Sequence, residues 1–562
     1  MSKLVNKVEQ QIKELILNAV EKAIAAGELP NEQLPSFAVE IPSDRSHGDY
    51  AVNAAMVSAR AFRLAPRKIA EIICSHMDLT DTFIVSYEIA GPGFINFTLS
   101  ARYYSEIIKD VETKAADYGR SDFGEGKKIL VEFVSANPTG PMHIGNARGG
   151  ALGDCLASVL EAAGYQVDRE FYVNDAGNQI EKFKTSLEAR YLQIFDETVE
   201  IPEDAYLGED IVIHARNFEK INGDKYVNCD SETRRQALCD FALPLNIQKL
   251  EDDLKKYRIT YDKWFRESTL HNNGAVAEII EKLKASGYTY EQDGALWFKS
   301  TAFGEEKDRV LVRANGIPTY FVPDIAYHYN KLVTRGYDIA IDVLGADHHG
   351  YVPRMRASLQ ALGVDPDRLD VVIMQMVRLV KNGETYKLSK RSGKAITLET
   401  LLDEVPIDAA RLFFNLREPN SHLEFDLDLA VAQDSQNPVY YVQYAHARIC
   451  SILKNLLSDG IEVKSLSAEQ LDVLTSPEER ELIRHIAAYT GSIIDGAKEY
   501  NPSVVTRYAI ELATLFHKFY NACPVKSASE NVRAARLCLC VAVKTVIQNA
   551  LSLLKISAPE SM

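Results

Sequence analysis

One stretch in the first third of the chain constrains the fold more than any other. Residues 128–134 (KILVEFV) form a mostly apolar run, a loop with Pro and Gly follows, and residues 146–163 read as a helix that ends at Gly164. Residues 166–173 then predict a second strand. A strand, a helix and a second strand in this order form a βαβ unit, the building block of a doubly wound parallel sheet. The sequence therefore predicts an α/β fold with a Rossmann-like core.

The pattern along the chain predicts three domains, which suits a length of 562 residues. Residues 1–120 combine an amphipathic helix with strands separated by Gly and Pro, which predicts an α+β domain. Residues 121–400 hold the parallel sheet, with an inserted subdomain at about 180–300. Residues 401–562 predict an all-α helical bundle. Further strands are expected at 309–313, 338–344 and 370–377, and the bundle's helices at 438–457, 478–498, 502–520 and 532–554.

Composition places the chain among ordinary globular proteins, with 46% hydrophobic and 25% charged residues. Mean hydropathy is −0.16, and no run approaches the roughly 20 unbroken apolar residues of a membrane span. The first helix carries charges that interrupt any signal-peptide core, and its apolar residues recur at helical spacing. We therefore expect a cytoplasmic protein that does not associate with a membrane.

The net charge of −16 argues at first against a nucleic-acid partner. Its distribution weakens that argument, because residues 196–253 hold 15 acidic and only 6 basic side chains. Residues 431–562 are neutral, with 13 of each sign. An acidic insertion can therefore coexist with surfaces that bind RNA elsewhere in the chain.

The eight cysteines predict no metal or disulfide framework, because no CxxC pair occurs. Adjacent His348 and His349 also suggest a metal site, but neighbouring side chains of an extended segment point to opposite faces and cannot easily bind one ion. We expect no structural zinc and no other metal ligands.

The loop between the first strand and its helix, residues 135–146 (SANPTGPMHIGN), has the features of a phosphate site. A helix N-terminus offers unpaired N–H groups and the positive end of the helix dipole. Gly140 and Gly145 allow close backbone approach, and His143 and Asn146 supply side-chain donors. A tight turn with a helix cap is the alternative. The glycine spacing does not match GxGxxG, and no Walker A loop is present.

A second loop, Lys387-Leu-Ser-Lys-Arg391, concentrates positive charge after the predicted strand at 370–377. Such a charge run is by itself most often a solvated surface loop. Two phosphate-type loops on one parallel sheet, however, indicate nucleotide chemistry at the carboxyl edge of the strands, where such sheets bind ligands.

These two loops resemble known motifs. Residues 143–146 (HIGN) resemble the HIGH motif, and residues 387–391 (KLSKR) resemble the KMSKS motif, of class I aminoacyl-tRNA synthetases. Longer stretches narrow the resemblance to the arginyl-tRNA synthetase family, and it extends from about residue 40 to the last residue. They are 44–53 (DRSHGDYAVN), 91–96 (GPGFIN), 172–179 (YVNDAGNQ), 316–320 (GIPTY), 345–350 (GADHHG), 437–448 (NPVYYVQYAHAR) and 553–562 (LLKISAPESM).

The resemblance implies an ATP-dependent reaction of L-arginine with tRNA(Arg). His143 and Asn146 would stabilise the α-phosphate during attack by the amino acid, and Lys387 and Lys390 would hold the departing pyrophosphate. ATP would bring Mg²⁺ with it. The other expected ATP contacts are Gly145, Gly345, Asp347 and Val377. The chain departs from the family pattern at Asn146, which cannot carry charge, and at Leu388.

The resemblance also implies a pocket for the guanidinium group, which pairs best with a carboxylate or an aromatic face. Tyr320 and Asp324 would line it with Glu132 nearby, while Asn137 and His348 would contact the polar end of the amino acid. From the residues alone, Tyr320 also fits a core aromatic, and Asp324 the capped start of a helix.

The terminal regions resemble RNA-binding parts of the same family. The N-terminal region would contact the corner of the tRNA, and Tyr440, Tyr444 and Arg448 in the helical region would contact the anticodon, although aromatic residues at this spacing are also common in helix packing. We expect a monomer. Two other functions fit less well: an RNA-binding protein without catalysis, and a nucleotidyltransferase that acts on a free small acid.

Overall fold

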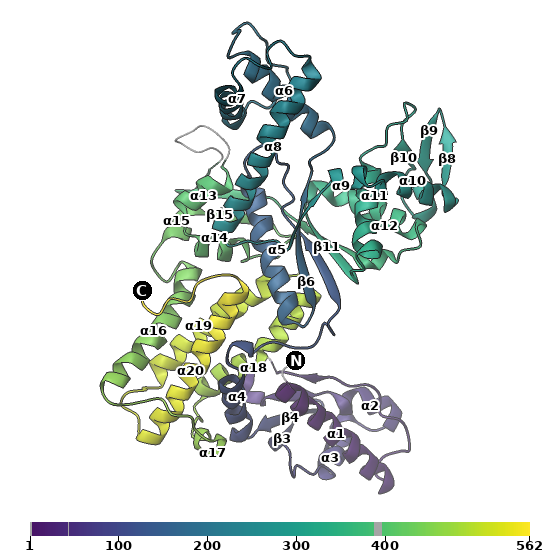
Figure 1. The fold of residues 1–562 in the computed structure, drawn as a ribbon. Coiled ribbons are helices and arrows are strands. Elements are labelled where there is room, and N and C mark those ends of the chain that lie inside the picture. Colours follow the sequence, from purple (N-terminus) through teal and green to yellow (C-terminus); the bar gives the residue numbers. More distant parts are fainter. Residues whose placement is uncertain (1–2, 43, 387–395) are drawn as a thin grey trace.

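A five-stranded parallel sheet forms the centre of the molecule (Figure 1). The computed structural model describes residues 3–42, 44–386 and 396–562. The strand order is β12-β11-β5-β6-β7. The first strand in the sequence, β5, therefore lies at the centre, with β6 and β7 on one side of it and β11 and β12 on the other. The strand order thus reverses between β5 and β11, and ligands of such sheets bind beyond the carboxyl ends of the strands at that point. The strands are β5 (Lys128–Glu132), β6 (Gln166–Val173), β7 (Lys263–Arg266), β11 (Ile339–Gly345) and β12 (Leu369–Met374).

The predicted βαβ unit is confirmed, and its helix α5 (Ile144–Ala162) is buried on almost every side. A Cβ atom at Gly153 would lie 2.3 Å from the Phe133 ring, so only glycine allows α5 to pack this closely on the end of β5. The strand ends at Glu132, slightly earlier than expected, because Val134 and Ser135 have positive φ angles of 70° and 40°. The backbone therefore turns sharply into the loop that leads to α5.

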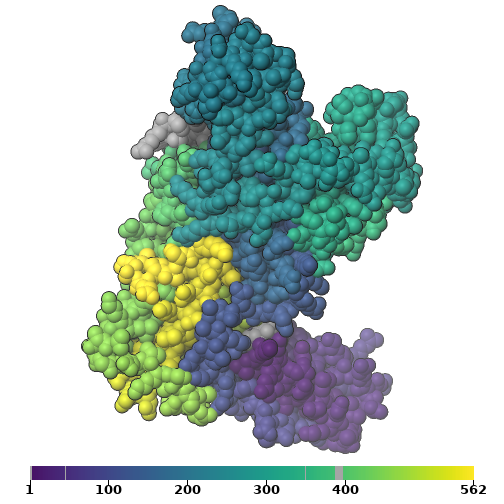
Figure 2. All heavy atoms as spheres, viewed as in Figure 1, coloured from purple at the N-terminus to yellow at the C-terminus, as the bar shows by residue number. Residues whose placement is uncertain are grey.

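The insertion expected at about 180–300 is not one block, and this prediction was wrong in detail. Strand β7 lies inside this range and pairs with β6 as the edge of the central sheet. It separates a helical arm from a smaller lobe, and the two project separately (Figures 1 and 2). The arm consists of α6 (Asn178–Leu192), α7 (Glu209–Asn222) and α8 (Ser231–Lys256). The lobe consists of α9 (Ser268–Asn272), α10 (Ala275–Ala285), β8 (Thr289–Gln292), β9 (Ala295–Phe298) and β10 (Arg309–Val312).

Two predicted strands differ from the expectation, one wholly and one in part. The strand at 309–313 is β10, which pairs antiparallel with β9 in the lobe and not with the central sheet. The strand at 370–377 is divided, because β12 ends at Met374 and Val377 begins β13 in a separate three-stranded sheet. That sheet, in the order β14-β13-β15, is built from β13 (Val377–Lys381), β14 (Glu384–Thr385) and β15 (Leu423–Asp426).

Five further helices complete the sheet domain. Helix α11 (Phe321–Tyr329) continues directly into a π-helical turn, Asn330–Thr334. A 3₁₀ turn, Ala346–Tyr351, follows β11 and leads into α12 (Val352–Ala361). After the second phosphate-type loop come α13 (Leu398–Glu404), α14 (Ile407–Phe414) and α15 (Leu427–Val431).

The N-terminal domain is α+β, as predicted. A four-stranded antiparallel sheet, β1-β2-β4-β3, packs against helix α1. The buried residues of α1 include Val8, Ile12, Leu15 and Ala19, which form the predicted apolar stripe. The elements are α1 (Lys3–Ala25), β1 (Val39–Glu40), β2 (Tyr50–Val52), α2 (Ala54–Phe62), α3 (Pro66–Ser75), β3 (Ile84–Ala90), β4 (Phe94–Leu99) and α4 (Ala101–Lys114).

The C-terminal region is a helical bundle with all four predicted helices present. They are α16 (Pro438–Ser458), α18 (Pro477–Lys498), α19 (Ser503–Ala522) and α20 (Glu530–Leu553), joined by the short α17 (Ala468–Leu471). By length and composition α20 could cross a membrane, but 56% of its most apolar window is buried inside the molecule. The N-terminal domain lies beside this bundle, where Asp49 accepts a hydrogen bond from Arg484 on α18 (Figure 1).

A buried arginine joins the bundle to the sheet domain. Arg411 on α14 is fully buried and donates to the Asp154 carboxylate of α5 at 2.5 Å. It also donates to the carbonyl oxygens of Tyr257, which follows α8, and Leu554, which follows α20. Its guanidinium therefore fixes four segments at one point, and Arg169 pairs with the second oxygen of Asp154.

We expect Arg411→Met to destabilise the fold by about 3–5 kcal/mol, because it leaves the buried Asp154 with only one cation. Calorimetry of the full chain would measure the fall in melting temperature. Arg258→Met is the control, since Arg258 pairs with Asp408 from a largely exposed position and its removal should cost less than about 1 kcal/mol. Equal shifts for the two variants would contradict the prediction.

Candidate active site

The loop that contains His143 meets residues 397 and 398, which follow the second predicted loop in the sequence, at the start of α5. His143 forms an isolated antiparallel bridge with Thr397, and the Leu398 amide donates to the Met142 carbonyl at 2.8 Å. The predicted residues Lys387 and Lys390 lie outside the described residues, in the segment 387–395 that immediately precedes this bridge.

His143 and Asn146 cap the N-terminus of α5 reciprocally. The Nδ1 atom of His143 accepts a hydrogen bond from the Gly145 amide at 3.1 Å, and Asn146 Oδ1 accepts from the His143 amide at 3.0 Å. Because Nδ1 is an acceptor, the ring proton lies on Nε2. Burial lowers the pKa of His143, which favours this neutral form. The cap thus presents a neutral N–H donor from His143 at the positive end of the helix dipole.

Asn146 has one group that the cap does not use. Its Oδ1 atom serves the capping box, while its Nδ2 donor makes no hydrogen bond to another described residue. An amide at this position can therefore hold the loop and still donate to an incoming anion. This dual use explains physically how Asn can stand where the HIGH motif has its second His.

The predicted nucleotide contacts gather at the same edge of the sheet. Gly145 lies in the first turn of α5, and Gly345 ends β11, where it pairs with Met374 at the end of β12. The side chain of Met374 lies against Gly149 of α5, so these strand ends adjoin the helix. Asp347 follows on the 3₁₀ turn with an exposed carboxylate, and Val377 begins β13 just beyond β12.

Arg148 holds the segment between β12 and β13 in place. It is fully buried on α5 and donates to the carbonyl oxygens of Gln375, Glu418 and Ser421. Among the described residues it has no carboxylate partner, and burial lowers its pKa to about 10. This uncompensated cation lies one turn beyond the capped N-terminus. It therefore adds positive potential near the phosphate-type loops.

A group of carboxylates, called here the acidic pocket, lies around α11 and consists of Asp324 with Glu267 and Glu132 near it. Asp324 is half-buried and accepts a hydrogen bond from the Tyr351 hydroxyl. Burial raises its pKa to about 7; His328 and Tyr351 counteract this, and the charges of Glu267 and Glu132 add to it. A carboxylate with a raised pKa that faces solvent favours a bound cation, whose charge would restore the ionised form.

Tyr320 immediately precedes α11 and is not a core residue, since it is 49% exposed. Its hydroxyl accepts a hydrogen bond from the Asn178 amide at the start of α6. Asp324 lies one helical turn further along, within α11, so it does not cap that helix. The interpretation of Tyr320 as a core aromatic is therefore wrong, while Asp324 does lie in the first turn of a helix, although not at its N-cap.

The remaining residues predicted around the pocket are more scattered. His348 lies on the 3₁₀ turn with its ring edge-on to Tyr351, the same residue that contacts Asp324. Asn137 is exposed in the loop after β5. Glu132 is buried, and its two carboxylate oxygens already accept from Lys331 and Ser135.

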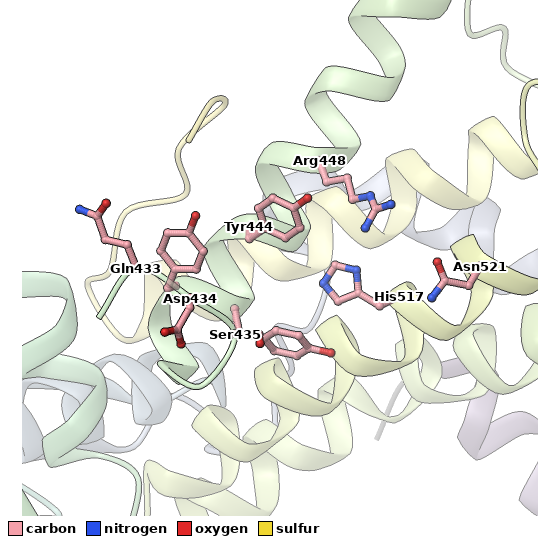
Figure 3. A pocket seen from close by; sticks show the side chains of 9 residues that line it. Gln433, Asp434, Ser435, Tyr444, Arg448, His517 and Asn521 are labelled. Atoms are coloured by element: carbon pink, nitrogen blue, oxygen red, sulfur yellow. The ribbon is translucent and has the colours of Figure 1, made fainter. Parts of the chain in front are cut away.

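A second cavity, of about 490 Å³, lies on the helical bundle and includes all three predicted RNA contacts (Figure 3). Tyr440 and Tyr444 on α16 stack with ring centroids 6.3 Å apart. The Arg448 guanidinium lies over the ring of Tyr520 at 4.3 Å and near Tyr444. The other lining residues are Gln433, Asp434, Ser435, Tyr441, His517 and Asn521.

Sequence analysis missed several residues of these sites. Asp342 was detectable in principle, because it interrupts the buried apolar stretch of β11, whereas the neighbours of Lys331 in sequence gave no such signal. His517 carried no sequence signal. In the structure it borders the bundle cavity, and burial and Arg448 lower its pKa to about 4. Among the described residues, no group of three His, Cys, Asp or Glu side chains is arranged to hold a metal ion.

Comparison with known proteins agrees with this geometry along the whole chain. Residues 10–99 match the family described as arginyl tRNA synthetase N terminal domain, 108–437 match tRNA synthetases class I (R), catalytic domain, and 442–562 match the DALR anticodon binding domain. The arginine–tRNA ligase of Caldanaerobacter subterraneus is 54% identical over all of both chains, and that of Acetivibrio thermocellus is 51% identical over all of both.

A solved structure extends the comparison to the fold. The Thermus thermophilus arginyl-tRNA synthetase superposes with a TM-score of 0.73 at 22% identity, over 97% of this chain and 99% of that one. The match of residues 108–437 to the class I catalytic domain, together with the parallel sheet, defines the chain as a class I aminoacyl-tRNA synthetase. Within that class, the chain belongs to the arginyl-tRNA synthetase family.

Arg148→Met should loosen the backbone around residues 375–377 and 418–421, because three buried carbonyl groups lose their donor. Hydrogen–deuterium exchange would report this as faster exchange in those two segments. Arg378→Met is the matched control, since Arg378 lies on neighbouring β13 but is largely exposed. Unchanged exchange in Arg148→Met would show that packing alone holds the segment.

Proposed function

We infer that this chain is an arginine–tRNA ligase of class I. It activates L-arginine with ATP to arginyl-adenylate, and it transfers the arginyl group to the 3′-terminal adenosine of tRNA(Arg). Pyrophosphate leaves in the first step and AMP in the second. The observation that carries the inference is the bridge between His143 and Thr397, in a chain whose three parts all match this family.

In the activation step, a carboxylate oxygen of arginine attacks the α-phosphorus of ATP while the bond to pyrophosphate breaks. We propose that His143 donates from Nε2 and Asn146 from Nδ2 to the α-phosphate oxygens as they gain negative charge. Both groups are fixed by the capping box before ATP binds, so they need not reorganise during the reaction. No protein group forms a covalent bond, and rate depends on positioning and electrostatics.

Residues from several segments at the carboxyl edge of the central sheet bind the nucleotide. We propose that Gly145, Gly345, Asp347 and Val377 contact ATP, and that Lys387 and Lys390 bind its β- and γ-phosphates. Mg²⁺ accompanies ATP and is held mostly by phosphate oxygens and water, as is usual for this ion. It neutralises charge on the phosphate chain.

The acidic pocket receives the substrate side chain. We propose that Asp324 pairs with the guanidinium and that Tyr320 lies against it, while Asn137 and His348 contact the carboxylate end. The 2′-hydroxyl of the terminal adenosine then attacks the activated carbonyl carbon and releases AMP. Tyr440, Tyr444 and Arg448 bind the anticodon by stacking and by charge, and residues 1–120 contact the tRNA corner. The enzyme acts as a cytoplasmic monomer.

ATP–pyrophosphate exchange and tRNA charging with each amino acid would test this function. We expect charging with arginine only, and exchange only when tRNA is present. Charging with another amino acid would refute the specificity, and exchange without tRNA would refute the tRNA requirement. RNA binding without any exchange would favour the non-catalytic alternative. Product formation from a free small acid without tRNA would favour the nucleotidyltransferase.

The variant Asn146→Asp distinguishes a role of Asn146 in capping α5 from a role in the activation step. The carboxylate keeps the acceptor for the His143 amide and favours the helix dipole, so the melting temperature should not fall. It loses the Nδ2 donor and places negative charge at the α-phosphate, so exchange should slow by about 100- to 1,000-fold. Activity within a few fold of the parent would mean that Asn146 only caps the helix.

Arginine binding should weaken in acid. Asp324 has a pKa of about 7 in the free protein, and only its ionised form pairs with a guanidinium. The KM for arginine should therefore rise about tenfold from pH 8 to pH 6, while the KM for ATP changes less. Asp324→Asn should raise the KM for arginine at both pH values and abolish most of this difference. A pH-independent KM for arginine in the parent would contradict the assignment.

A further inference from the structure

A lysine with no exposed surface lies behind the acidic pocket. Lys331 belongs to the π-helical turn Asn330–Thr334, which continues α11. Its Nζ atom donates to Glu132 Oε2 at 2.5 Å and to Asp342 Oδ1 at 2.7 Å, and lies 4.2 Å from the ring centroid of Tyr327. Isolated π-helical turns are uncommon and occur often at functional sites. Here the turn aims the lysine between β5 and β11.

The contacts of Lys331 continue to the pocket itself. The second oxygen of Asp342 lies 2.7 Å from His328 Nε2, and His328 Nδ1 lies 2.7 Å from the carbonyl oxygen of Asp324. His328, Lys331 and Asp324 all belong to α11 or its π-helical extension. Lys331 and His328 therefore connect this helix to β5 and β11. This series of contacts ends at the backbone carbonyl of Asp324.

The same contacts determine which carboxylate is free to bind an incoming cation. Four carboxylates surround this region, namely Glu132, Glu267, Asp324 and Asp342. Lys331 pairs with Glu132 and Asp342, and the other oxygen of Glu132 accepts from the Ser135 hydroxyl. Among the described residues no ion pair within 4 Å reaches Asp324. It is therefore the pocket's partner for one incoming cation.

We propose that Lys331 is a positioning residue that sets arginine specificity. It neutralises Glu132 and Asp342, and it fixes α11 so that Asp324 and Tyr320 keep a spacing suited to a single guanidinium. Without this cation, Glu132 and Asp342 compete for a proton or for the substrate's charge, and the end of α11 loses its anchor. The inference rests on the proposed arginine pocket at Asp324.

Lys331→Met, which keeps the length and removes the charge, tests the proposal in the full-length enzyme with tRNA present. We expect the KM for arginine in pyrophosphate exchange to rise about thirtyfold or more, with the KM for ATP nearly unchanged. The preference for arginine over lysine, as a ratio of kcat/KM, should also fall. Lys331→Arg retains the cation and should recover most of both quantities.

Arg335→Met is the matched control. Arg335 follows the same π-helical turn, and its guanidinium forms a largely buried ion pair with Glu170 on β6 rather than with Glu132 or Asp342. The variant Arg335→Met should lower the melting temperature about as much as Lys331→Met does, but it should leave the KM for arginine unchanged. If both variants raise that KM equally, or if Lys331→Met leaves it unchanged, the proposal is overturned.

Two further variants keep the outcome decisive. If Lys331→Met does not fold, Asp342→Asn removes one of the two anions and should give the same KM pattern to a smaller degree. An unchanged KM for arginine in Asp342→Asn would then count against the proposal. Asp324→Asn separates the two inferences: if it leaves the KM for arginine unaltered, the pocket itself is misassigned. If it raises that KM and Lys331→Met does not, only the role of Lys331 fails.

Discussion

The bridge between His143 and Thr397 is the contact on which the proposed chemistry depends. It joins the loop after the first strand of the sheet to a segment more than 200 residues further along the chain. Each side would be an ordinary surface loop without the other. The capping box on α5 then fixes His143 and Asn146 in advance, with their free donors at the positive end of a helix whose body is buried.

Buried charge organises the site around that contact. Within the described part of the chain Arg148 has no carboxylate partner, and it lies one turn beyond the capped N-terminus of α5, where its cation favours an anion. Lys331 is buried and paired with both Glu132 and Asp342, and in the proposed mechanism this leaves Asp324 for the substrate. The two cations differ in their effect because their partners differ. The partners of Arg148 are neutral carbonyl groups, so its positive charge remains, whereas the partners of Lys331 are carboxylates, which cancel its charge. The acidic net charge of the chain has little bearing on either site.

Sequence patterns predicted most elements, because long helices and buried strands repeat with clear periods. The βαβ unit, the apolar stripe of α1 and all four long bundle helices agree with the structure. The errors involved short strands. β7 has four residues, so its pairing with β6 left no pattern distinct from the insertion around it, and β10 reads like a strand of any sheet. Periodicity predicts that a strand exists, but its partner depends on the whole fold.

The sequence by itself determined the motifs, the capped loop at His143–Asn146, and the candidates Tyr320 and Asp324. These features depend on residues near one another in the chain or on residue types with a characteristic chemistry. Only the tertiary structure decided that Thr397 adjoins His143, that Glu132 is already paired with Lys331, and that Arg148 holds three distant carbonyl groups. Such pairings join residues remote in sequence, and packing alone brings them within hydrogen-bonding distance.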